Sequence, residues 1–307
     1  EERTAGRAYC VTPETRILRA DLRWVAAGDL QQGDTIVGFD EEPITTPTAH
    51  RPVRHFQLAS ISHAERKTLP VFEVELEDGT TVRATGEHRW LAMQSNLRRV
   101  PQWIRTDTLA EELKMGRRRW FIGRYLPVWE EDRSYEAGIL AGAFDADGSI
   151  ERGGSNRAPL LRFTQKDNPL LDRITDLLIQ KKLPFRRNPH NSKADIFSLA
   201  VTSWQETLRF LGSMRPARLF AKWQESFSID DREFQCVAKL MVVRVSPIGE
   251  REVAALTSSS GTYLTEGLPS HNTGHICHIS EFAHWPAERT GVLIGGVQPS
   301  VPGPPAG

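Results

Sequence analysis

The chain has 307 residues, with 39 basic against 39 acidic side chains and three cysteines, at Cys10, Cys236 and Cys277. Its length and its 39% apolar content suffice for two packed cores at ~150 residues per domain. No segment approaches the ~20 consecutive apolar residues of a membrane-spanning helix, and the amino terminus has no apolar signal segment. Three widely spaced cysteines exclude a disulfide framework, so a cysteine that matters here acts as a thiol. We therefore expect a soluble, intracellular protein without a membrane partner.

Short strands separated by turns are predicted between Cys10 and about Pro127. Residues 71–82 alternate apolar and polar side chains around the turn Asp78-Gly79, which is typical of a β hairpin. Strand patterns return after about residue 228, over residues 238–249 and 251–267. The two ends together predict a mainly β fold.

The hydrophobic period changes near Asp132, where a helix that ends at Gly148 is predicted. The helix carries small residues at i, i+4 spacing: Ala137, Gly138, Ala141 and Gly142. Because each glycine costs ~1 kcal/mol relative to alanine, we expect this helix to pack tightly against another element.

Further elements follow this helix in the order strand, helix, strand, strand, helix. They are predicted over residues 159–165, 168–183, 184–190, 194–202 and 203–214. This order predicts a separate α/β unit that interrupts the β part.

Three short segments carry chemistry: Cys10, the run from Thr85 to His88, and His271-Asn272-Thr273. A single cysteine is more often a small buried hydrophobe, and a single histidine is more often structural. Together and in this order, the segments resemble an intein, a self-splicing protein insert, over residues 10–272. The resemblance implies a mainly β, horseshoe-like splicing domain of the Hint type, interrupted by the α/β unit.

The splicing chemistry follows from these residue types and needs no cofactor. The Cys10 thiolate can attack the carbonyl carbon of Tyr9, which turns an amide into a thioester. The resemblance implies that His88 protonates the departing nitrogen and that Thr85 polarises the same peptide. It further implies acyl transfer to Thr273, cyclisation of Asn272 with assistance from His271, and ligation of the two flanks.

One position departs from the pattern of the family. Ala255 lies where many inteins carry an acidic residue or a cysteine that activates the downstream nucleophile, so the group that deprotonates Thr273 is open. A hydroxyl also ionises less readily than a thiol, whose pKa is ~8.5. We therefore expect slow or condition-dependent splicing.

The predicted helix ends in the sequence LAGAFDADG, residues 140–148. Seven of these nine positions match the motif of the LAGLIDADG homing endonucleases, which the α/β unit resembles. In that family two such helices pack face to face, and the acidic residue before the last glycine, here Asp147, holds a divalent metal, for which Mg²⁺ is suited. Asp145 is expected to cap or orient the turn. Nuclease support or DNA contact is predicted for Arg162, Gln165 and Lys166, with a solvated strand end as the alternative for Lys166.

Only one such motif is present, and one unit cannot supply two active carboxylates. Cleavage of double-stranded DNA, the intein-less host gene, therefore requires a homodimer on a nearly palindromic site. A decayed nuclease, or a DNA-binding module without autoprocessing, is the alternative. Residues 133–227 carry 15 basic and 10 acidic residues and are the one net-basic segment, a modest excess that fits DNA binding.

The resemblance divides the chain into five segments. They are a flank over 1–9, a splicing part over 10–132, an endonuclease-like domain over 133–227, a second splicing part over 228–272 and a flank over 273–307. In the last flank, residues 276–281 form an apolar run that ends at Glu281 and resembles the Walker B region of phage terminase large subunits. No GxxxxGK[ST] loop is present, so ATP hydrolysis is not expected. Such a host places the protein in the cytoplasm of a phage-infected or prophage-bearing bacterial cell.

A zinc site near the carboxyl end is a competing interpretation. The candidate ligands are His271, His275, Cys277, His278 and His284. Their spacing does not fit a usual zinc finger, and strand alternation would send Cys277 and His278 to opposite faces.

Overall fold

The computed structural model describes residues 9–45, 52–95, 101–116, 118–151, 159–189, 195–201, 203–227, 229–230 and 232–271. The chain divides into two compact units, Glu1–Gly274 and His275–Gly307. The predictions for Asn272, Thr273 and Glu281, and those for the four carboxyl-terminal zinc candidates after His271, lie outside the described residues.

Eleven strands, one helix and a short 3-10 turn make up the β part. The amino-terminal elements are β1 (Arg16–Leu18), β2 (Trp24–Ala26), η1 (Ala27–Asp29), β3 (Thr35–Phe39), β4 (Phe56–Leu76), β5 (Thr81–Thr85), β6 (Arg89–Gln94), β7 (Gln102–Arg105), α1 (Thr106–Lys114) and β8 (Trp120–Arg124). The carboxyl-terminal strands are β13 (Ala238–Ser258), β14 (Thr262–Thr265) and β15 (Leu268–His271).

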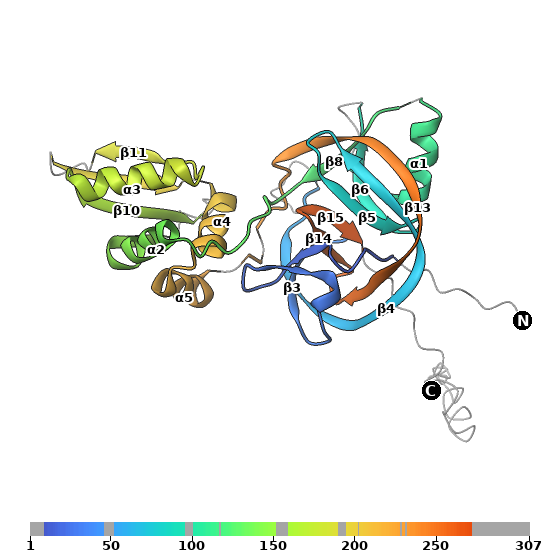
Figure 1. Cartoon of the computed structure of the whole chain (residues 1–307), viewed down its shortest axis with the longest axis horizontal. Coiled ribbons are helices and arrows are strands. Elements are labelled where there is room, and N and C mark those ends of the chain that lie inside the picture. The colour runs from blue at the N-terminus through green and yellow to red at the C-terminus, as the bar shows by residue number, and fades with distance from the viewer. Residues whose placement is uncertain are drawn as a thin grey trace, which may run out of the picture. The chain divides into compact units, whose positions relative to one another are not determined.

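These strands form one antiparallel sheet in the order β2-β1-β14-β15-β6-β8-β13-β4-β3, with β5 added to β4 and β7 to β6. The two longest strands, β4 and β13, have 21 residues each and curve around the shorter strands (Figure 1). At ~3.3 Å per residue a flat strand of this length would exceed any single core, so the strands must twist and bend. Their register shifts at three places, and such bulges are sites of bending.

β13 corrects one prediction from the sequence. Two separate strands are expected around Pro247 and Gly249, yet the structure has one continuous strand. The break in pattern is a bulge between Pro247 and Glu250, where Gly249 adopts a φ of 82° that other residues rarely take. The hairpin predicted around Asp78 is confirmed, since Val74 of β4 pairs with Val82 of β5.

The α/β unit contains the predicted elements, one further strand and one further helix. They are α2 (Tyr135–Asp147), β9 (Gly148–Glu151), β10 (Leu160–Lys166), α3 (Pro169–Gln180), β11 (Arg186–Pro189), β12 (Ile196–Val201), α4 (Trp204–Met214) and α5 (Ala217–Ser226). The strands form a second antiparallel sheet in the order β11-β12-β10-β9. A mainly β fold interrupted by an α/β unit is therefore confirmed.

Helix α2 has a buried face and an open face, and its two glycines lie on the open one. Ala137, Leu140 and Phe144 are buried, and the ring of Phe144 lies 4.5 Å from that of Phe210 in α4. Gly138 and Gly142, in contrast, are exposed, and no atom lies within 4 Å of where a Cβ would stand. The helix thus packs as expected through Ala137, Leu140 and Phe144, but the two glycines point away from that face and take no part in the packing within one chain.

Hydrogen bonds join the carboxyl end of α2 to the amino end of α5. Asp145 Oδ1 accepts hydrogen bonds from the backbone N–H groups of Arg218 and Leu219, at 3.0 and 3.1 Å. The Arg218 guanidinium donates to the carbonyl oxygens of Phe144, Asp145 and Gly148. Each helix end thus satisfies backbone groups that the helix itself leaves unpaired. None of the described helices is long and apolar enough to cross a membrane.

Substituting Gly212 is expected to destabilise the protein although it lies within a helix. A Cβ there would clash with Trp129 Nε1 and stand 2.6 Å from the Leu22 carbonyl oxygen. We expect Gly212→Ala to lower the free energy of unfolding by about 1–3 kcal/mol, whereas exposed Gly138→Ala should raise it by up to about 1 kcal/mol. Urea unfolding of monomeric protein in a Cys10→Ala, Asn272→Ala background measures both. A stabilising Gly212→Ala would contradict the packing.

Candidate functional site

The segment that begins at Cys10 lies against β5. The Cys10 carbonyl oxygen accepts from the Thr85 N–H at 3.0 Å, and the Arg83 carbonyl accepts from the Thr12 N–H at 3.0 Å. The Cys10 N–H donates to Thr85 Oγ1 at 3.1 Å. The nitrogen of the Tyr9–Cys10 peptide bond is therefore held by the threonine hydroxyl.

The Cys10 side chain lies in a small apolar cluster with Val71 of β4 and Val253 and Ala255 of β13. Burial raises the pKa of the thiol to about 12, a shift that Lys67 opposes and Glu65 adds to. The thiol is thus protonated at neutral pH. Ala255 packs in this cluster and brings no titratable group to it.

His88 is fully buried, at 0% exposure, with its ring 4.5 Å from that of Trp90. Its carbonyl oxygen accepts from the Thr106 N–H at 2.9 Å, which fixes the backbone. Neither ring nitrogen has a hydrogen-bond partner of standard geometry among the described residues. Burial, reinforced by His271, lowers the pKa of His88 to about 3, and the backbone of Tyr9 partly opposes the shift. The structure therefore places a neutral imidazole near the Tyr9 backbone.

His271 is the last residue of β15, and its ring also lies beside Tyr9. It pairs with Arg89 of β6 and is 6% exposed. Its ring meets Tyr9 edge to face at 5.7 Å, and Nε2 lies 2.6 Å from Oε1 of Glu41. The fold thus brings Cys10, Thr85, His88 and His271 together around Tyr9.

Sequence reasoning missed two residues at this site, Glu41 and Tyr263. Tyr263 is buried, its hydroxyl has no hydrogen-bond partner in the described part of the chain, and burial together with Cys10 raises its pKa. Glu41 lies 230 positions from His271, so no local pattern could have joined them. The run Asp-Glu-Glu after a strand was the one available signal, and it equally suits an exposed turn.

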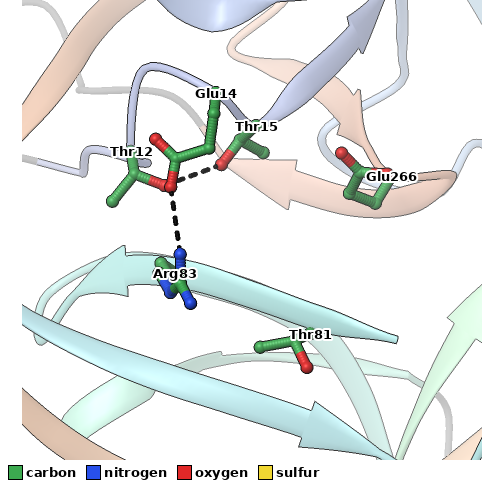
Figure 2. Close-up of a pocket in the computed structure, with 6 residues that line it drawn as sticks. All are labelled: Thr12, Glu14, Thr15, Thr81, Arg83 and Glu266. Atoms are coloured by element: carbon green, nitrogen blue, oxygen red, sulfur yellow. Dashed lines mark hydrogen bonds and ion pairs between the residues drawn. The ribbon is translucent and has the colours of Figure 1, made fainter. Parts of the chain in front are cut away.

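A small open pocket of about 150 Å³ lies beside the segment that follows Cys10. Figure 2 shows its lining residues Thr12, Glu14, Thr15, Thr81, Arg83 and Glu266. Thr12 and Thr15 share a hydrogen bond of 3.2 Å, and Arg83 Nη1 lies 3.4 Å from Glu14 Oε1 (Figure 2). Glu266 pairs with Arg16 at 2.8 Å. These two ion pairs link Glu14 to β5 and link β1 to the turn after β14.

The residues predicted for DNA cleavage lie on α2 and β10 of the α/β unit. Asp147 is exposed and accepts from Gln165 Nε2 at 3.1 Å. Lys166 is exposed on the same strand, and Arg162 Nη2 lies 3.9 Å from Glu151 Oε2. No group of three or more His, Cys, Asp or Glu side chains within the described ranges could hold a metal ion.

Residues 134–212 match the family model of the LAGLIDADG-like domain. This stretch runs from the N-cap of α2 into α4, so the chain contains a LAGLIDADG-like domain. Members of the family bind DNA and typically use a divalent metal.

Among curated proteins, Elongation factor 2 of Methanopyrus kandleri is 29% identical over 120 residues, which are 35% of this chain and 9% of that protein. The chain therefore spans less than a tenth of the length of this relative. Among solved structures, the DnaB intein of Synechocystis sp. PCC 6803 is similar with a TM-score of 0.36 and 13% identity, over 86% of this chain and 97% of that one. The Ssp DnaB mini-intein variant M86 has a TM-score of 0.38 and 12% identity, over 88% and 96% of the two chains.

His88 is expected to make stability depend on pH. Its pKa is about 3 in the folded protein and 6.5 ordinarily, so the unfolded chain binds more protons between these values. Stability from this residue is complete above pH ~6.5 and is lost as the pH falls, at up to ~1.4 kcal/mol per pH unit. Urea unfolding of the Cys10→Ala, Asn272→Ala chain between about pH 7 and pH 5 should show a smaller slope with His88→Gln. Equal slopes would contradict a neutral buried imidazole.

Proposed function

We propose that residues 10–272 are a self-splicing intein that excises itself and joins residues 1–9 to residues 273–307. The observation that carries the proposal is the convergence on one peptide bond. Thr85 holds the nitrogen of the Tyr9–Cys10 bond, while His88 and His271 lie beside Tyr9. We also propose that the flanks belong to a phage terminase large subunit, in which Glu281 is the Walker B carboxylate.

In the first step, Cys10 Sγ bonds to the carbonyl carbon of Tyr9 and the bond from that carbon to the Cys10 nitrogen breaks. The thiol proton ends on the departing nitrogen, so atoms and charges balance. His88 would pass this proton to the departing nitrogen, because its low pKa favours release of a proton from the imidazolium. Thr85 Oγ1, as acceptor of the Cys10 N–H, orients the nitrogen toward the incoming proton.

The later steps move the acyl group and release the element. The Thr273 hydroxyl attacks the thioester and frees the Cys10 thiol, and Asn272 then cyclises with cleavage of its bond to Thr273. An O-to-N shift completes the peptide bond between Tyr9 and Thr273. Ala255 contributes no acid or base to acyl transfer, and a hydroxyl nucleophile slows that step.

Expression of the chain followed by mass spectrometry tests splicing. We expect an excised fragment of residues 10–272 and a joined peptide of the two flanks. Cys10→Ala with Asn272→Ala should remove both products. Cys236→Ala, which changes the other described free cysteine, is the matched control and should leave both in place. Products that persist in the double variant would contradict the assignment.

We further propose that the LAGLIDADG-like domain cuts double-stranded DNA as a homodimer. Gly138 and Gly142 form an open face on α2 that a second copy of the helix can approach closely, and Asp147 lies at its end. The exposed carboxylate fits as one half of a Mg²⁺ site that two copies share. A bound metal ion would stabilise charge on the attacking and leaving oxygens of the phosphodiester.

Cleavage of the intein-less host gene in the presence of Mg²⁺ tests the second proposal. Asp147→Asn should reduce cutting by at least about 100-fold, because each site loses a metal ligand. Asp176→Asn changes an exposed aspartate of α3 and should cut like the parent chain. Binding of the DNA without cutting by the parent chain would instead support the decayed nuclease.

A further inference from the structure

We propose that Glu41 is a positioning residue that fixes the ring tautomer of His271 for cleavage after Asn272. The inference rests on the proposed splicing function and extends it to a residue far away in the sequence. Its basis is the short contact of 2.6 Å between Glu41 Oε1 and His271 Nε2. In the sequence, His271 immediately precedes Asn272, the residue that must cyclise in the proposed reaction.

Two side chains hold the main chain of Glu41, and a glycine leaves room for its carboxylate. The Glu41 carbonyl oxygen accepts from Trp103 Nε1 at 3.4 Å and from Arg54 Nε at 3.2 Å. At Gly261, in the turn between β13 and β14, a Cβ would stand 2.9 Å from Glu41 Oε2. The absence of a side chain at Gly261 therefore leaves room for the carboxylate.

The His271 ring is held from two further sides. The Trp103 ring meets it edge to face at 5.1 Å and the Tyr9 ring at 5.7 Å. A carboxylate oxygen can only accept, so Nε2 must donate its hydrogen to Glu41. In the neutral imidazole this places the hydrogen on Nε2, so Nδ1 is the ring nitrogen that carries the lone pair.

In the proposed cyclisation of Asn272, His271 Nδ1 carries the proton from one nitrogen to the other. The side-chain amide nitrogen of Asn272 bonds to the main-chain carbonyl carbon of Asn272, and the bond from that carbon to the Thr273 nitrogen breaks. Nδ1 takes one proton from the attacking nitrogen and returns one proton to the departing nitrogen, giving a succinimide and a free amine. Glu41 neither gains nor loses a proton, and it acts only through the orientation and tautomer of the ring.

The experiment isolates this step in a Cys10→Ala background, in which cleavage after Asn272 is the reaction that remains. Release of residues 273–307 is timed by mass spectrometry for the parent chain, Glu41→Gln, Glu41→Asp and the matched control Glu42→Gln. We expect Glu41→Gln to slow release by about 10-fold or more, Glu41→Asp to restore part of the rate, and Glu42→Gln to match the parent.

A second readout separates positioning from a structural role. The ring ¹⁵N chemical shifts of His271, measured with Asn272→Ala so that the chain stays intact, should report the Nε2–H tautomer in the parent and in Glu42→Gln. They should report a mixture of tautomers in Glu41→Gln. An unchanged rate, or a slowed rate with an unchanged tautomer, overturns the proposal. The splicing function itself stands or falls with the mass spectrometry of the unaltered chain. If the Cys10→Ala parent does not cleave, the tautomer in Glu41→Gln decides alone whether Glu41 positions the ring.

Discussion

The pairing of β4 with β13 is the constraint on which the site depends. It joins segments that lie before and after the whole α/β unit, from Val242 opposite Leu76 to Ser258 opposite Ile61. Val71 on one strand and Val253 and Ala255 on the other then cover Cys10. The turn after β13 leads into β14 and β15, which returns His271 to β6. Since loop closure entropy grows only slowly with length, a long interruption between β8 and β13 costs this pairing little.

Burial shifts the pKa values of Cys10 and His88 in opposite directions. It raises the pKa of the Cys10 acid and lowers the pKa of the His88 base, so both stay uncharged at neutral pH. The interior also strengthens each polar contact, which gives the Cys10–Thr85 hydrogen bond more influence than it would have at the surface.

Features that depend on neighbouring residues in the sequence could be predicted from the sequence. The alternation around Asp78 and the helix ending at Gly148 were predicted from their residues alone, because a hairpin turn and a helical face depend on neighbours in sequence. The continuity of β13 was not predicted from the sequence, because the pairing with β4 carries the strand through its bulge. Helices α1 and α5 were missed, as both follow strand-like or turn-like residues without a side-chain cap. Glu41 was beyond reach because only the fold brings it to His271.

The two aspartates of the LAGAFDADG segment differ in what the chain itself demands of them. Asp145 binds two backbone N–H groups of α5, whereas Asp147 is exposed and holds only the flexible Gln165 side chain among its described partners. Folding therefore constrains position 145 more than position 147, because replacing Asp145 would leave two backbone N–H groups of α5 without their acceptor.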